Sequence, residues 1–347
     1  MSGLKVVVVG LDGTPWKFLK PLIDRDELPF LKKIISKSAI AVLKTEIPPY
    51  TWCGWKCYST GTHPGKFKAF YWFRLRELMR GRFIPNDSRS YKSPEIWDYL
   101  SSAGYKCLVV NMPMTYPPKK INGIMISGIP ALEIHEFVYP RYLKEVLLSK
   151  YNYEIVSKKN FNFTSPNHWY EVINKLMEIM RSRFKVVKDI LSQQDMDFIH
   201  VTIFCTDTTL HWLWTRKDYE HLLLKFWKAL DRELERFVDF LYKKFDQNFI
   251  LFIISDHGMT PLKCIFYINN WLLEKGYLKL KFSRLVLLYI LVRCHKLIEI
   301  FKRVGMKILR VLKFRLPERL ILNIFFRLPA GKPVSYTHLT LPTTERV

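Results

Sequence analysis

Three segments of the chain share a run of apolar, mostly β-branched residues that ends at an acidic side chain. They are residues 5–12 (KVVVVGLD), 197–207 (DFIHVTIFCTD) and 249–257 (FILFIISDH). Runs that are apolar on both faces are typical of parallel strands buried between helices. Between them, apolar residues recur every three or four positions in 169–191 and 219–245, which predicts two long amphipathic helices.

Shorter apolar runs predict three further strands, at 39–43, 106–111 and 123–127. Alternation of strands and helices predicts an α/β fold of three layers, α/β/α, in which a mostly parallel central sheet lies between helices. In such sheets, ligands bind beyond the carboxyl ends of the strands. We therefore expect a functional site where the three acidic strand ends lie.

Composition changes this picture mainly through the distribution of charge. The 347 residues are 49% hydrophobic and 25% charged, as in globular proteins, which excludes a disordered chain. The net charge is +24, and Lys and Arg outnumber Asp and Glu most strongly in 261–333. Within that region, residues 281–328 interleave basic and apolar side chains and predict a basic helical insert near the C-terminus. The insert is either a solvated face packed on the sheet or a peripheral contact for a membrane surface or polyanion.

The sequence carries no pattern typical of export or membrane insertion. It has no run of 18 or more apolar residues, and its first predicted strand begins almost at the N-terminus without a charged leader. The six cysteines have the spacing of neither a zinc ribbon nor a disulfide framework. We therefore expect a cytoplasmic protein.

The acidic strand ends carry metal-binding side chains. Asp256 and His257 offer an oxygen and a nitrogen at the end of a buried strand, which suits a divalent metal such as zinc, although such pairs also occur in ordinary turns. Asp207 and His211 are four residues apart and share a face if a helix begins there. Asp12 would by itself be an ordinary turn residue. Because three strands deliver these five residues to one sheet edge, we expect a metal site.

Thr51 is the candidate nucleophile. Its hydroxyl follows two prolines and precedes bulky aromatic residues, in what the sequence predicts to be an extended loop. A threonine in such a loop usually has no chemical role. Beside a metal ion it becomes a nucleophile candidate, because coordination lowers the pKa of the hydroxyl.

Short motifs occur in a recognisable order along residues 10–278. They are GLDG at 10–13, TW at 51–52, TG at 60–61, PGK at 64–66, MTYPP at 114–118, NG at 122–123, TD at 206–207 with His211, SDHGM at 255–259, and the segment 269–278. This order resembles the type I phosphodiesterase/nucleotide pyrophosphatase family of the alkaline phosphatase superfamily. The resemblance implies an alkaline-phosphatase-like fold and a hydrolase of phosphodiester or pyrophosphate bonds. It also implies an anionic small-molecule substrate and two divalent metal ions, with zinc as the expected metal.

The resemblance further implies a role for each candidate residue. Thr51 would attack phosphorus and form a phosphothreonine ester. One metal ion would be held by four residues: Asp12, Thr51, Asp256 and His257. The other would be held by two: Asp207 and His211.

Two features depart from the family pattern. The second ion normally takes a further histidine from a late segment, and neither His295, in the basic insert, nor His338 is a convincing counterpart. Residues 66–68 read KFK where the family often has Lys-His-Gly.

Residues 334–347 read as a translated sequencing adaptor. We therefore expect a truncated catalytic domain at 1–333 with impaired activity, followed by a non-native tail at 334–347.

Other classes fit less well. A sulfatase shares the fold, but residues 53–56 (CGWK) do not form the Cys-x-Pro-x-Arg type motif that it needs, and a mutase of the superfamily would prefer serine as nucleophile. The main alternative is a non-enzymatic protein with a degenerate hydrolase fold that binds a membrane surface or polyanion through 281–328. No zinc finger or helix-turn-helix pattern accompanies the charge, so we expect no specific nucleic acid partner.

Overall fold

The chain divides into two compact units, residues 1–261 and 262–347. The computed structural model describes residues 3–67, 71–80, 82–131, 135–156 and 167–277. In the second unit the described part contains one short helix, α11 (Ile268–Glu274). All elements of the candidate site lie in the first unit.

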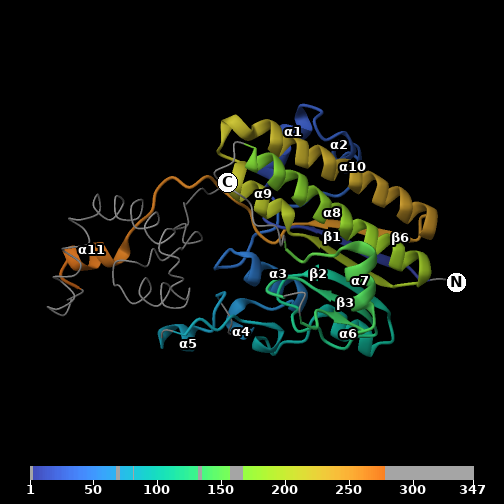
Figure 1. Cartoon of the computed structure of the whole chain (residues 1–347), viewed down its shortest axis with the longest axis horizontal. Coiled ribbons are helices and arrows are strands. Elements are labelled where there is room, and N and C mark those ends of the chain that lie inside the picture. Colours follow the sequence, from blue (N-terminus) through green and yellow to red (C-terminus); the bar gives the residue numbers. More distant parts are fainter. Residues whose placement is uncertain (1–2, 68–70, 81, 132–134, 157–166, 278–347) are drawn as a thin grey trace, which may run out of the picture. The chain divides into compact units, whose positions relative to one another are not determined.

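The described residues of the first unit form a six-stranded sheet with the order β4-β3-β2-β5-β1-β6 (Figure 1). The strands are β1 (Lys5–Leu11), β2 (Cys107–Met112), β3 (Gly123–Ser127), β4 (Val138–Tyr139), β5 (Phe198–Ile203) and β6 (Phe249–Ile254). Every pairing is parallel except that of β3 with β4. The α/β class and the mostly parallel sheet are therefore confirmed.

Helices cover both faces of the sheet (Figure 1). One face carries α1 (Trp16–Asp24), α2 (Pro29–Ile35), α7 (Leu143–Tyr151), α8 (His168–Gln193), α9 (Cys205–Leu213) and α10 (Glu220–Phe245). The other carries α3 (Thr51–Thr60) and α6 (Ile96–Ser102), with the short helices α4 (Pro64–Phe67) and α5 (Leu75–Met79) nearby in the chain. The helices α8 and α10 begin and end within two residues of the predicted ranges, so that prediction is confirmed.

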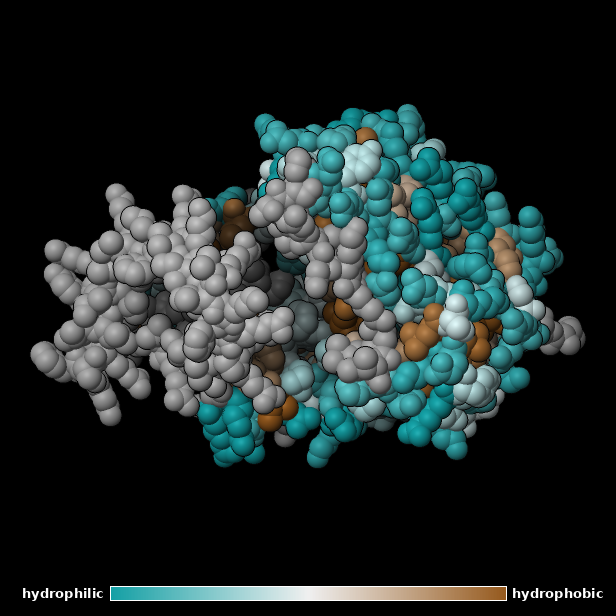
Figure 2. Space-filling model, viewed as in Figure 1, coloured by the Kyte–Doolittle hydropathy of each residue, from teal (hydrophilic) through white to brown (hydrophobic). Residues whose placement is uncertain are grey.

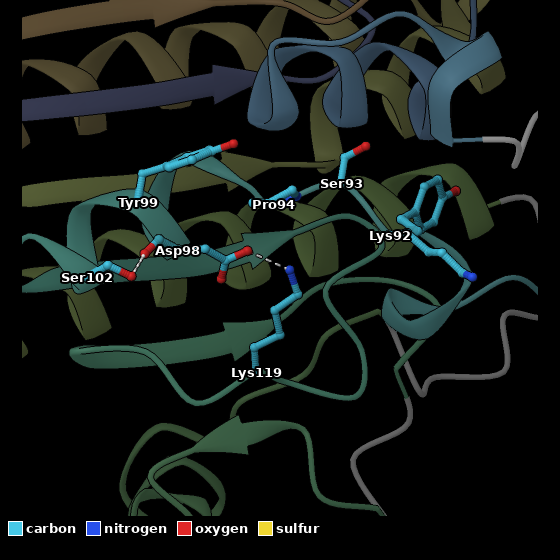
Figure 3. Close-up of a pocket in the computed structure, with 8 residues that line it drawn as sticks. Lys92, Ser93, Pro94, Asp98, Tyr99, Ser102 and Lys119 are labelled. Carbon is cyan, nitrogen blue, oxygen red and sulfur yellow. Dashed lines mark hydrogen bonds and ion pairs between the residues drawn. The ribbon is translucent and has the colours of Figure 1, made fainter.

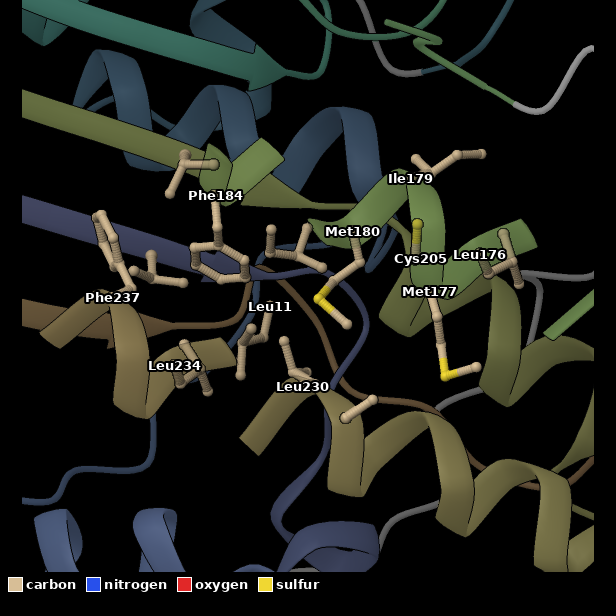
Figure 4. Packing of buried hydrophobic residues seen from close by; sticks show 14 of the residues in the cluster. Leu11, Leu176, Met177, Ile179, Met180, Phe184, Cys205, Leu230, Leu234 and Phe237 are labelled. Atoms are coloured by element: carbon tan, nitrogen blue, oxygen red, sulfur yellow. The ribbon is translucent and has the colours of Figure 1, made fainter. Parts of the chain in front are cut away.

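Alternate residues of each strand point to the two helical layers. In β1, Val7, Val9 and Leu11 belong to the larger buried cluster, together with apolar residues of α8 and α10. Figure 4 shows part of this cluster, in which Leu11 lies among side chains of these two helices: Met180, Phe184, Leu230 and Phe237. Val8 points the other way, into a smaller cluster with Trp55 and Trp97. The sheet is therefore buried on both faces at β1.

The prediction of a strand at 39–43 was wrong. These residues have no regular secondary structure, and Ile40, Val42 and Leu43 are 55%, 83% and 69% exposed. Their apolar and β-branched side chains fit a strand. However, no strand in the described part of the chain pairs with this segment, and propensity alone does not form a sheet. The short β4 was not predicted, because two residues carry no recognisable period.

Other predictions fall outside the described ranges. The basic insert expected at 281–328 and the tail expected at 334–347 both lie there, together with His295 and His338. On the face of the molecule in Figure 2, hydrophilic side chains predominate over the described surface and hydrophobic ones form small patches. None of the described helices combines the length and the apolar character needed to cross a membrane.

Candidate metal centre

Three neighbouring strands end at the same edge of the sheet. In the parallel register, the last residue of β1 pairs with the last residue of β5, and the residue before it pairs with the last residue of β6. The chain continues from these ends to Asp12, Asp207 and Asp256, which are all buried. The structure therefore brings together the carboxylates that the sequence places far apart.

Asp12, Asp256 and His257 form the tightest group. One ligand atom from each of them lies within 4.8 Å of the other two. Nε2 of His257 is 3.6 Å from Oδ1 of Asp12 and 3.5 Å from Oδ2 of Asp256. Both carboxylate oxygens are buried, and neither accepts a hydrogen bond from the residues that the structure describes. Buried carboxylate oxygens without donors are costly, so two oxygens and a nitrogen in this arrangement fit a divalent cation.

The hydroxyl of Thr51 lies at this group. Its Oγ1 is 3.1 Å from Nε2 of His257, and Thr51 is buried. The prediction of an extended loop was wrong at Thr51, because Thr51 is the first residue of α3, which follows the extended residue Tyr50. The first N–H groups of a helix lack intrahelical acceptors and favour a nearby anion. Thr51 therefore lies where negative charge is stabilised.

Asp207 and His211 form a pair next to this group. The predicted helix exists as α9, so both residues share one face, and Nε2 of His211 is 3.3 Å from Oδ1 of Asp207. Asp207 packs against the backbone of Gly13, where an added Cβ would lie 2.5 Å from Oδ1 of Asp207. The carboxylate of Asp207 thus adjoins the residue that follows Asp12, but it is not part of the three-residue group.

Burial and mutual repulsion raise the pKa of the clustered carboxyl groups. Burial raises the pKa of Asp12 well above its usual range, and the charges of Asp256 and Asp207 raise it further. Burial also raises the pKa of Asp256, to about 6. The hydrogen bond with Asp207 raises the pKa of His211. A bound cation would relieve this repulsion and favour the ionised carboxylates.

Hydrogen bonds on the far side of each ligand fix its orientation. The backbone N–H of Gly13 donates to Oδ1 of Asp256 over 3.1 Å, and Nε1 of Trp55 donates to Oδ2 of Asp12 over 2.8 Å. Nδ1 of His257 is 2.8 Å from the carbonyl oxygen of Gly258, so Nδ1 carries the proton and Nε2 presents a lone pair to the group. The sequence did not assign Trp55 to the metal site, because the acceptor of its N–H group, Asp12, lies 43 residues away in the chain.

A surface pocket lies elsewhere, beside α6 (Figure 3). It is lined by Tyr91, Lys92, Ser93, Pro94, Asp98, Tyr99, Ser102 and Lys119. Nζ of Lys119 is 2.8 Å from a carboxylate oxygen of Asp98, so these opposite charges neutralise each other. No residue of the candidate metal centre lines this pocket, and we therefore place the chemistry at the strand ends.

Comparison with protein families agrees with this geometry. The profile of the family described as type I phosphodiesterase / nucleotide pyrophosphatase matches residues 6–313. The chain therefore belongs to this family of hydrolases. No curated protein sequence matches the chain significantly.

Solved structures show the same fold. The chain is similar to phosphonoacetate hydrolase from Sinorhizobium meliloti 1021 in complex with phosphonoformate, with a TM-score of 0.54 and 16% identity over 78% of this chain and 62% of that chain. The complex of that enzyme with phosphonoacetate gives a TM-score of 0.50 and 15% identity over the same shares. The chain thus spans 62% of the length of these relatives. The likeness shows that the chain shares the fold of this hydrolase.

Proposed function

We propose that the chain is a metal-dependent hydrolase of phosphodiester or pyrophosphate bonds in which Thr51 is the nucleophile. The observation that carries this proposal is the position of Thr51 Oγ1, 3.1 Å from Nε2 of His257 in the buried group with Asp12 and Asp256. Membership of the family supports the reaction class. The phosphonate ligands of the S. meliloti enzyme support an anionic phosphorus compound as substrate.

The donor set fits two divalent ions, with zinc as the expected metal. Asp12, Asp256, His257 and Thr51 would hold one ion, and Asp207 with His211 would contribute to the other. When bound, such ions lower the pKa of a coordinated hydroxyl and neutralise charge on the phosphoryl oxygens. Oxygen donors combined with imidazole nitrogen are typical ligands of zinc.

The chain's own residues position the nucleophile. Thr51 Oγ1 loses its proton and attacks phosphorus, so that the Oγ1–P bond forms while the bond from phosphorus to the leaving alcohol or phosphate breaks. The leaving oxygen takes up the proton that Oγ1 released. Water then attacks phosphorus, so that a new O–P bond forms while the Oγ1–P bond breaks, and one proton of this water goes to Oγ1. His257 orients Thr51 and gives it no proton, because its own proton is held at Nδ1 by the carbonyl of Gly258.

The start of α3 contributes electrostatically. Backbone N–H groups of its first turn favour negative charge both on the ionised Oγ1 and on the transferred phosphoryl group. Thr51 and Asp12 are buried, and electrostatic interactions are stronger where less bulk water surrounds the charges.

Replacement of the nucleophile tests the proposal. We expect the zinc-loaded wild-type chain to hydrolyse bis-p-nitrophenyl phosphate, and Thr51→Ala to lose roughly a thousandfold or more in turnover, about 4 kcal/mol of barrier. Thr51→Ser keeps the hydroxyl and serves as the matched control, which should retain measurable turnover. Equal turnover of the wild type and Thr51→Ala would refute the covalent role. Faster hydrolysis of p-nitrophenyl phosphate than of the diester would refute the diesterase assignment.

A further inference from the structure

We propose that Trp55 is a positioning residue of the metal centre. Its indole N–H binds one carboxylate oxygen of Asp12, so that the other oxygen alone faces His257 and a cation. The inference rests on the proposed function, because it assumes that this group holds a metal ion.

The contact itself is direct and buried. Nε1 of Trp55 donates to Oδ2 of Asp12 over 2.8 Å, and both side chains are fully buried. The second oxygen, Oδ1, is the one that lies 3.6 Å from Nε2 of His257. Because the N–H group occupies Oδ2, Asp12 can offer a cation Oδ1 as a single ligand atom.

The indole ring cannot easily leave this position. At Gly10, in β1, an added Cβ would lie 2.3 Å from Cη2 of Trp55, so the ring fills the space that this glycine leaves. The rings of Tyr58 and His200 meet the indole edge-on, with centroids 5.8 and 5.7 Å away and interplanar angles of 85°. Residues of β1, α3 and β5 therefore fix the direction of the N–H bond.

Trp55 also links the ligand to the nucleophile. It follows Thr51 by four residues in α3, which is about one helical turn and a rise of roughly 6 Å. Both residues lie on one side of a helix that is itself buried. The helix thereby sets the spacing between the hydroxyl of Thr51 and the donor that holds Asp12.

Substitution of the donor tests the inference by metal affinity. Trp55→Phe keeps an aromatic ring but removes the N–H group, and we expect its zinc affinity to fall about 10- to 100-fold, as measured by competition with a chromophoric chelator. The matched control is Trp97→Phe. Trp97 is fully buried in the same apolar cluster, and its Nε1 has no hydrogen-bond partner in the described part of the chain. Its zinc affinity should match that of the wild type.

A second readout follows the indole N–H groups themselves. Among the indole ¹H–¹⁵N signals of the ten tryptophans, one should shift both when zinc is added to the wild-type chain and when Asp12 is changed to Asn. That signal should be missing from the spectrum of Trp55→Phe. The signal of Trp97 should respond to neither change.

The outcomes separate the two proposals. Equal zinc affinities of Trp55→Phe and Trp97→Phe, or the absence of any indole signal that responds to both zinc and Asp12→Asn, would overturn the role of Trp55 and leave the metal centre intact. A wild-type chain that does not bind zinc would instead overturn the proposed function on which this inference rests.

Discussion

Two glycines in and after β1 set the spacing of the candidate metal centre. An added Cβ at Gly10 would collide with the ring of Trp55, and one at Gly13 would lie 2.5 Å from Oδ1 of Asp207. Gly13 also has a φ of +60°, which side chains rarely adopt. Because Gly10 and Gly13 have no side chains, there is room for the ring of Trp55 and the carboxylate of Asp207 beside them.

Gly13→Ala is therefore expected to be destabilising. The strained backbone and the contact with Asp207 should lower the free energy of unfolding by about 1–3 kcal/mol, as measured by urea denaturation. Gly258→Ala is a suitable control, because within the described part of the chain its Cβ would meet only Pro15, at an ordinary 3.6 Å. Equal stabilities of the two variants would contradict the steric argument.

A buried histidine adds a pH dependence. His200 is fully buried, with Nδ1 3.2 Å from Oη of Tyr58 and Nε2 2.8 Å from Oγ1 of Thr202. Burial lowers the pKa of His200 from 6.5 to about 3. Below pH 6.5 the unfolded chain therefore binds a proton that the folded chain excludes, and stability falls as the pH is lowered toward 3.

His200→Gln removes this titration. From pH 6 to pH 5, the wild type should lose about 1 kcal/mol more unfolding free energy than the variant, since a full proton difference is worth about 1.4 kcal/mol per pH unit. Urea denaturation at pH 7, 6 and 5 measures the difference. Parallel pH profiles of the two proteins would show that His200 does not titrate differently in the folded state.

Among the elements, α3 connects the candidate centre to the rest of its layer. Near its N-terminus it carries Thr51 and Trp55, and farther along it carries the fully buried Lys56, which forms an ion pair with Glu95 at the start of α6. Lys119 is 2.9 Å from the other carboxylate oxygen of Glu95. The pairing anchors α3 to α6, next to the pocket in Figure 3.

The pKa shifts follow from this anchoring. Burial lowers the pKa of Lys56, and the charge of Glu95 offsets this only in part. Burial by itself would raise the pKa of Glu95, but the charges of Lys56 and Lys119 outweigh it, so the pKa of Glu95 is lowered. The pair is thus stabilised by its own opposite charges, and removal of one leaves the other buried without compensation.

Glu95→Gln is expected to cost about 3 kcal/mol of unfolding free energy for that reason. The control is Asp24→Asn, which breaks the exposed pair of Lys20 and Asp24 and should cost less than about 1 kcal/mol. Chemical denaturation of both variants provides the comparison. A cost below that of the exposed pair would mean that the buried pair does not hold α3.

For the whole molecule, the candidate metal centre would couple cation binding to global stability. Its ligands come from residues that are far apart in the chain, at the ends of β1 and β6, so a cation bound there stabilises the folded state and not the unfolded one. The clustered, repelling carboxylates make this linkage strong, because without a cation their charges oppose folding.

Zinc at about 100 times its dissociation constant should raise the unfolding free energy by about 2.7 kcal/mol. For a protein of this size, this corresponds to a rise in Tm of several degrees, which chelation should reverse. Differential scanning fluorimetry measures the shift, and Asp256→Asn should largely abolish it. A wild-type Tm that does not respond to zinc would contradict the candidate centre.

The amino-acid sequence by itself determined the features that depend on local pattern. Apolar runs located five strands, the period of α8 and α10 located two helices, and the acidic strand ends located Asp12, Asp207 and Asp256. These predictions held because side-chain periodicity is a property of neighbouring residues. The order of short motifs along the chain also indicated the family.

Only the tertiary structure decided which distant groups pair. Among the described residues, 39–43 have no partner strand. The helix α3 begins at Thr51, and the indole N–H of Trp55 donates to the carboxylate of Asp12. A strand needs backbone partners from elsewhere in the chain, and a buried hydrogen bond needs a donor whose direction is fixed by packing. Neither condition is present in a local stretch of sequence, because both arise only when the sheet and its helices have assembled.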